Sequence, residues 1–309
     1  MSFKEHRRTL TPRWGRVWID IGGGYAVLVA TAWALVTLQR SVPLLVPLWI
    51  VLGAFIFGYT LAFIQLFLHE AAHFNVAPGR RLNDFLANVF LGAMVGMDIE
   101  PYRIIHLDHH RYLGTPLDTE RNYFTPLNWK FIVQALSGIM LLTVLLRRRD
   151  RVQVSEAKDG TTSARPAARW RPIVLLAGLA LNLAIIGMAL WQGQWTLAIA
   201  WPIGMVSVHP FVNATRQILE HRSFEAKSTI DYTKTPHGAV TRMFGSGPVA
   251  STLGGAGFNR HLLHHWEPQI SYTRLGDLER FLLDTPAAAV LRSQITTYGR
   301  AFARLIRAE

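Results

Sequence analysis

Apolar residues along this chain gather in six segments, which polar or charged stretches separate. A helix needs roughly 20 apolar residues to cross a bilayer. The first, second and fifth segments are long enough, and the sixth is long enough if its helix continues toward His221. The third and fourth, with 13 and 16 residues, are too short to cross alone. The six segments cover about residues 17–38, 44–68, 85–97, 131–146, 172–191 and 195–212.

Basic residues indicate which segments cross, because stretches rich in Lys and Arg stay on the cytoplasmic side of a membrane. Residues 147–171 hold eight basic and three acidic residues, so we expect them inside. Segment 131–146 is then an interfacial helix, since a single crossing would carry that loop outside. The N-terminal stretch is also expected inside; its basic residues are Lys4, Arg7, Arg8, Arg13 and Arg16.

The pattern therefore predicts an all-α integral membrane protein with one domain over residues 1–309. Both termini are expected in the cytoplasm. The predicted parts are four transmembrane helices at about 17–38, 44–68, 172–191 and 195–212, interfacial helices at about 85–97 and 131–146, a flexible linker at 147–171, and a cytoplasmic C-terminal region at 213–309.

Composition agrees with a membrane protein. Charged residues make up 17% of the chain, whereas a soluble domain typically has about 25%. The net charge of +12 is explained by cytoplasmic segments beside anionic lipid, so we expect no nucleic-acid partner. The chain has no cysteine, which excludes thiolate metal sites and any built-in ferredoxin or rubredoxin module.

Histidine supplies the candidate chemistry. Eight of the twelve histidines lie in three short clusters, "HEAAH" at 69–73, "HLDHH" at 106–110 and "HLLHH" at 261–265. Positions i, i+3 and i+4 share one face of a helix, so each cluster presents its imidazoles on one side of a turn. A fourth element, "NATRQILEH", places Asn213, Gln217 and His221 on one face at the end of the sixth segment. Pro101 and Asn259 are candidate start residues for the two HxxHH helices.

The number of clustered histidines argues for two metal ions. One zinc ion takes about four ligands, and eight or nine imidazoles exceed that. Imidazole ligands without thiolate suit Zn, Cu, Fe or Ni, so ligand type alone leaves the metal open. Read alone, "HEAAH" matches a zinc protease with Glu70 as general base, but that function leaves six other clustered histidines without a role. A haem carrier or a metal transporter fits less well, because the clusters lie at the ends of the spans and the spans hold few polar residues.

With its three histidine clusters in this order, the sequence resembles the integral-membrane fatty acid desaturase and hydroxylase superfamily. The resemblance runs from residue 17 to about 285 and includes "RQILEH" and the tail "HHWEPQISYTRLGDLERF". It implies a diiron centre that uses O2 and a separate electron donor of ferredoxin, rubredoxin or cytochrome b5 type. The implied iron ligands are His69, His73, His106, His109, His110, His221, His261, His264 and His265.

The resemblance also suggests groups that hold the ligands and the substrate. The expected substrate is a fatty acyl chain that gains a double bond; hydroxylation or ketolation of a lipid or carotenoid is the competing reaction. An inner membrane of bacterial type, with the active site on the cytoplasmic side, is the expected location. Candidates to support the ligands are Glu70, Asp108, Asn213, Gln217, Glu220 and Asn259. Candidates to line a substrate tunnel are Phe55, Tyr59, Phe63, Met94, Met97 and Trp201.

Overall fold

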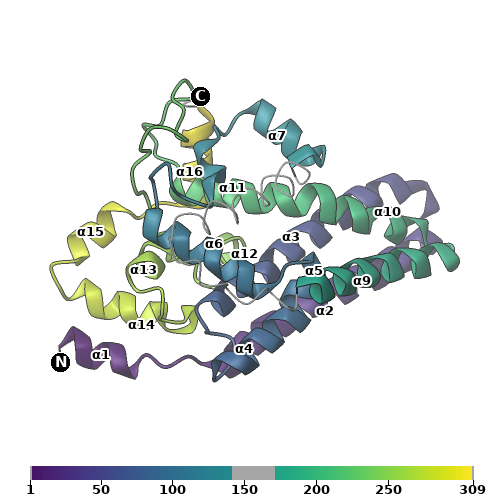
Figure 1. Ribbon diagram of the computed structural model, residues 1–309. Coiled ribbons are helices and arrows are strands. Elements are labelled where there is room, and N and C mark those ends of the chain that lie inside the picture. The colour runs from purple at the N-terminus through teal and green to yellow at the C-terminus, as the bar shows by residue number, and fades with distance from the viewer. Residues whose placement is uncertain (1, 141–170, 308–309) are drawn as a thin grey trace.

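The computed structural model describes residues 2–140 and 171–307, and within these ranges it contains helices and no β-strand. Figure 1 shows long helices bundled at one end and short helices gathered at the other. The α-helices are α1 (Phe3–Thr9), α2 (Trp14–Ser41), α3 (Val46–Ala72), α4 (Arg80–Ala87), α5 (Ala93–Val95), α6 (Ile99–Tyr112), α7 (Trp129–Leu136), α9 (Arg171–Trp191), α10 (Trp195–Ile203), α11 (His209–His221), α12 (Pro248–Thr252), α13 (His261–Trp266), α14 (Tyr272–Leu283), α15 (Ala288–Ser293) and α16 (Tyr298–Arg307).

Four helical stretches in the described residues are long and apolar enough to cross a membrane, which confirms the all-α class and the four predicted spans. The fourth combines α10, a π-helical turn at Gly204–Val208, and α11. It therefore continues to His221, as its role as a span requires. The stretches are Trp14–Ser41, Pro43–Ala72, Arg171–Trp191 and Trp195–His221, each enclosing a predicted segment.

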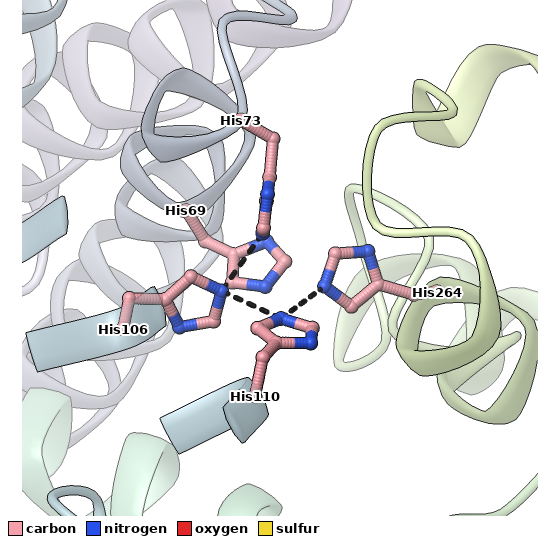
Figure 2. A group of neighbouring side chains, drawn as sticks. All are labelled: His69, His73, His106, His110 and His264. Atoms are coloured by element: carbon pink, nitrogen blue, oxygen red, sulfur yellow. Dashed lines mark hydrogen bonds between the residues drawn. The ribbon is translucent and has the colours of Figure 1, made fainter. Parts of the chain in front are cut away.

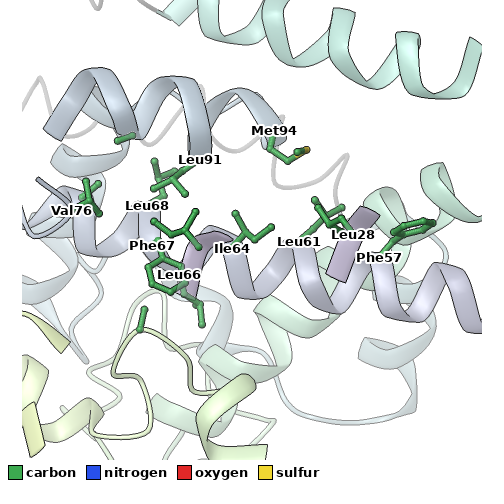
Figure 3. Packing of buried hydrophobic residues seen from close by; sticks show 14 of the residues in the cluster. Leu28, Phe57, Leu61, Ile64, Leu66, Phe67, Leu68, Val76, Leu91 and Met94 are labelled. Carbon is green, nitrogen blue, oxygen red and sulfur yellow. The ribbon is translucent and has the colours of Figure 1, made fainter. Parts of the chain in front are cut away.

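Helix α3 lies at the centre of the bundle and carries much of the apolar core. Phe57, Leu61 and Ile64 of α3 belong to the same apolar cluster as Leu28 of α2 (Figure 3). Where α3 meets the fourth span the backbones nearly touch, because a Cβ on Gly58 would lie 2.6 Å from the carbonyl oxygen of Gly204. This close packing holds the histidine-bearing end of α3 against α11.

The short segment predicted at 85–97 begins earlier than expected. Helix α4 starts at Arg80 and continues through a π-helical turn at Asn88–Gly92 into α5. The chain then turns, so that this helical stretch and α6 meet at 88°. Leu82 and Phe85 on α4 are exposed, as an interfacial helix requires. Its position at the membrane surface stays a prediction.

Helix α7 covers the start of the other short segment, 131–146. It begins at Trp129, two residues before the predicted boundary, and ends at Leu136. Gly138 follows with φ +80°, and a side chain there would press on Val206 of the fourth span. This left-handed residue ends α7 where the sequence pattern predicted an unbroken helix. Residues 141–146, and all of the predicted linker 147–171 except Arg171, lie outside the described residues.

The starts of the two HxxHH helices differ from the sequence prediction. Helix α6 begins at Ile99, and its N-cap is Asp98, whose carboxylate accepts a hydrogen bond from the Glu100 N–H at 3.1 Å. Pro101 is therefore inside the first turn. Helix α13 begins at His261 with Arg260 at the N-cap position, so Asn259 is not its cap. The Asn259 amide instead donates to the Gly245 carbonyl at 2.9 Å.

Candidate metal centre

The nine histidines predicted as ligands come together from the C-terminal end of α3, where His73 directly follows the helix, and from α6, α11 and α13. The first group holds five imidazoles, each with one ring nitrogen that lies within 4.8 Å of those of the others. Figure 2 shows their rings converging on one point from three helices. Three contacts join neighbouring Nε2 atoms: 2.9 Å from His73 to His106, 3.0 Å from His106 to His110, and 3.0 Å from His110 to His264. The group comprises His69, His73, His106, His110 and His264.

The second group contains the other four histidines. The Nε2 atom of His261 lies 2.8 Å from that of His221 and 3.2 Å from that of His265. His109 joins His221 and His265 within the same 4.8 Å limit. The two groups share an edge, because the His110 and His265 rings lie 4.3 Å apart. Two adjacent ion sites are therefore possible.

Hydrogen bonds alone cannot account for these contacts. An imidazole nitrogen carries either one proton or one lone pair, in a single direction. The Nε2 atoms of His106, His110 and His261 each face two other Nε2 atoms, so none of them can pair with both neighbours. His69 is 3% exposed, and neither of its ring nitrogens has a hydrogen-bond partner among the described residues. Such burial is costly unless another group takes the lone pairs.

A metal ion at the centre of each group would satisfy them. Two imidazole nitrogens that bind one ion at ~2.1 Å are separated by about 3.0 Å when the angle between the bonds is 90°. The observed separations between Nε2 atoms, 2.8–3.2 Å, match that distance. Burial, followed by the neighbouring imidazoles, lowers the pKa of His261, His264 and His265 well below its ordinary value. These rings are neutral at pH 7, as metal ligands must be.

Three of the ring nitrogens that point away from the centre are held by groups that the sequence analysis did not name. His109 Nδ1 lies 2.9 Å from an oxygen of Asp118, and His106 Nδ1 lies 3.1 Å from an oxygen of Glu120. His221 Nδ1 lies 2.9 Å from the Val240 carbonyl oxygen. An N–H that donates in this way leaves Nε2 free to bind metal and fixes the ring. "DTE" at 118–120, just after the turn that ends α6, is the sequence signal for the two carboxylates.

Comparison with known families agrees with this site. The fatty acid desaturase family model matches residues 41–295, which include every histidine of both groups. The chain belongs to the fatty acid desaturase family. No curated protein and no solved structure matches this desaturase-family chain.

Two of the six residues predicted to support the ligands, Gln217 and Glu220, lie next to the histidine groups. Gln217 donates a hydrogen bond to Glu120 at 2.9 Å, and Glu120 in turn holds His106. Glu220 accepts hydrogen bonds from Arg216 at 2.6 Å and from the Tyr298 hydroxyl at 3.1 Å. One Glu220 oxygen lies 3.9 Å from His261 Nε2, so this carboxylate borders the second group directly.

The other four have different contacts. The Glu70 carboxylate accepts a hydrogen bond from the Tyr272 backbone N–H at 3.1 Å, which ties α3 to the start of α14. Asp108 forms an ion pair with Arg111 at 3.8 Å. Asn213 donates to the side-chain oxygen of Gln65 at 2.8 Å, and Asn259 donates to Gly245.

A cavity of about 170 Å³ borders the first histidine group at His69. Of the six tunnel candidates, Met97 lines this cavity. Phe55 is 53% exposed on the outside of α3, and Trp201 is buried against Phe57. The remaining histidines lie outside both groups: His6 stacks on Phe281, His209 contacts Gln65, and His237 contacts Ser223.

Proposed function

We propose that this protein is an O2-dependent membrane oxidoreductase that introduces a double bond into a lipid acyl chain at a centre of two iron ions. The observation that carries the proposal is the convergence of nine histidines in two adjacent groups, within a chain of the fatty acid desaturase family. The first ion would be held by His69, His73, His106, His110 and His264, and the second by His109, His221, His261 and His265.

The chemistry explains why such a centre is needed. No side chain has a pKa that can remove a proton from an alkyl chain, so the reaction must be an oxidation. When bound, the two irons supply O2 activation. Desaturation removes two hydrogen atoms from neighbouring carbons, consumes O2, two electrons and two protons, and releases two water molecules. The protein's part is to bind and orient the chain, to exclude bulk water, and to hold nine imidazoles in place around the centre.

The electrons would come from a separate carrier of ferredoxin, rubredoxin or cytochrome b5 type. A surface cavity of about 500 Å³ reaches the metal centre from the side of His110 and His265. Arg111 and Trp266 also border it, and both are exposed. An acidic carrier docked there would stand beside two of the proposed ligands. The basic N-terminal stretch supports placing this side in the cytoplasm, in an inner membrane of bacterial type.

Expression in a bacterial host, followed by mass spectrometry of the extracted lipids, tests the reaction. Desaturation gives a product lighter by two hydrogen atoms; hydroxylation, the competing reaction, gives one heavier by an oxygen atom. His109→Ala and His264→Ala are expected to abolish the product, whereas His6→Ala, outside both groups, is expected to retain it. Metal analysis should find about two irons per chain. One zinc without iron, or a product unchanged in both ligand variants, would overturn the proposal.

A further inference from the structure

The histidines of the third cluster lie on a helix that is too short to hold its own position. Helix α13 has six residues, whereas isolated helices shorter than about 12–15 residues are only marginally stable in water. It supplies His264 to the first histidine group and His261 and His265 to the second. The position of α13 therefore affects both groups, and it depends on what packs on this helix.

The face of α13 opposite the histidines is apolar and buried. Leu262 and Leu263 are 6% and 0% exposed, and successive residues about 100° apart around a helix place them away from the three imidazoles. They belong to one apolar cluster with Leu10, which comes from the start of the chain and is 7% exposed. The cluster also contains Met243, Ile270, Leu275, Leu278 and Leu291.

The segment that carries Leu10 lies along α14. We call residues 3–13, which comprise α1 and the stretch that leads to α2, the N-terminal arm; Figure 1 shows α1 beside α14. Arg274 of α14 donates through Nε to the Thr11 carbonyl oxygen at 2.7 Å. Arg13 forms an ion pair with Asp277 of α14 at 3.3 Å. The arm is thus bound to the helix that packs on the apolar face of α13.

The arm also contacts the end of α13 directly. Arg7 Nε lies 2.7 Å from a carboxylate oxygen of Glu267, the C-cap residue of α13. At its other end the arm continues into α2, the first span. Asp20 of α2 accepts a hydrogen bond at 2.8 Å from the hydroxyl of Tyr272, the first residue of α14. The arm therefore joins the first span to the two helices that carry and support the third cluster.

We propose, resting on the two-ion centre of the function proposed above, that the N-terminal arm holds α13 against the metal centre and thereby slows the release of both ions. The arm contains none of the nine ligands. It acts through Leu10 and Arg7, which fix α14 and α13. Displacement of α13 removes three imidazoles at once, one from the first group and two from the second. The strength of these contacts therefore limits how long the ions stay bound.

Substitution of Leu10 in the full-length protein tests the packing. Leu10→Ala leaves a cavity in the cluster and is expected to speed the transfer of iron from the purified protein to a chelator at least about tenfold. Leu35→Ala is the matched control. Leu35 of α2 is 4% exposed and packs on Gly53, near the opposite end of α3 from His69. Its loss should lower the melting temperature and leave iron release as in the wild type.

A charge exchange tests the contact with α13 itself. Arg7→Glu places two carboxylates next to each other and is expected to speed iron release about two- to fivefold, because the pair is partly exposed. The double exchange, Arg7→Glu with Glu267→Arg, is expected to restore slow release. Such a rescue depends on the contact between the two side chains and not on either one alone.

Hydrogen exchange in the metal-free protein provides a measurement that needs no iron. The backbone amides of α13 and α14 are expected to exchange faster in Leu10→Ala than in the wild type, because the arm limits their local opening. The amides of α9, in the third span, are expected to exchange at the same rate in both proteins.

Two failures can be told apart. Wild-type rates of iron release or of α13 exchange in Leu10→Ala, equally fast release in Leu35→Ala, or a double exchange without rescue would overturn the role of the arm alone. A wild-type protein that binds no iron would overturn the proposed function, and faster exchange of α13 in Leu10→Ala would then still support the arm's hold on this helix.

Discussion

Asp118 contacts the ring nitrogen of His109 that is not the proposed metal ligand: its two carboxylate oxygens lie 2.9 and 3.1 Å from His109 Nδ1. Asp118 is itself fully buried and is held by the Tyr123 hydroxyl and by the Glu120 backbone N–H at 2.8 Å. The position of the His109 ring is thus set by a network outside the histidine groups.

Asp118→Asn is expected to weaken metal binding at the second group about 10–100-fold, because the aspartate orients the ring and raises its basicity. Asp108→Asn is the matched control on α6, since Asp108 pairs with Arg111, which is 65% exposed at its side chain. Titration of the metal-free protein with iron, followed by metal analysis, measures both. Equal loss in the two variants would contradict the role given to Asp118.

Glu220 is expected to contribute to the second group, because it lies 3.9 Å from His261 Nε2 and is almost completely buried. Glu220→Gln should lower the iron content toward one ion per chain while keeping the side chain's shape. Glu279→Gln provides the comparison. Glu279 forms an ion pair with Arg260 at 2.6 Å and belongs to neither histidine group. An iron content equal to that of the wild type in Glu220→Gln would show that this carboxylate has no part in metal binding.

Arg103 is expected to stabilise the end of α3 that carries His69 and His73. It donates to the carbonyl oxygens of Ala71 and Ala72 at 3.1 and 3.0 Å and forms an ion pair with Asp84. Arg103→Ala should cost about 2–3 kcal/mol of unfolding free energy, because these carbonyls and the carboxylate lose a charged donor.

Arg111→Ala, which breaks an exposed pair, should cost about 0.5 kcal/mol or less and serves as the control. Thermal unfolding in detergent measures both variants. Similar melting temperatures for the two would contradict the importance of Arg103.

The metal-free protein is expected to lose stability as the pH falls. Burial, with Arg103 nearby, lowers the pKa of His73 to about 3. Its pKa in the unfolded chain is about 6.5, so protons bind the unfolded state more readily. Stability is therefore complete above pH ~6.5 and decreases as the pH falls from there toward 3. Melting curves between pH 8 and 5, with and without iron, test this.

Bound iron should delay the acid loss, because the metal competes with protons for the same nitrogens. Loss of iron and a fall in melting temperature are then expected over the same pH range. A metal-free protein with a constant melting temperature from pH 8 to 5 would contradict a neutral, buried His73.

The orientation in the membrane can be tested directly, because the chain has no cysteine to remove. Gln192→Cys lies in the exposed turn between α9 and α10, and Lys234→Cys lies at an exposed position after α11. A thiol reagent that cannot cross membranes should label the first in intact cells and the second after permeabilisation. The opposite result would reverse the proposed cytoplasmic placement of the active site.

The sequence by itself determined the helical class, the four spans and the identity of the nine histidines. Each of these depends on local order: a span is a continuous apolar run, and histidines at i, i+3 and i+4 share a helix face wherever the helix lies. The structure extended the first three spans by one to four residues at an end and the fourth by nine. It ended α7 at Leu136, because the conformation of a residue such as Gly138 depends on what packs beside it.

Only the tertiary structure decided how the histidines divide and what holds them. Neighbours in sequence, His109 and His110, belong to different groups, because adjacent positions on α6 point about 100° apart and meet different helices. Asp118 and Glu120 support the site from a loop that turns back beneath α6, a relation with no fixed spacing in the chain. The cavity beside His69 likewise exists because α3, α6 and α11, which are far apart in the sequence, meet there.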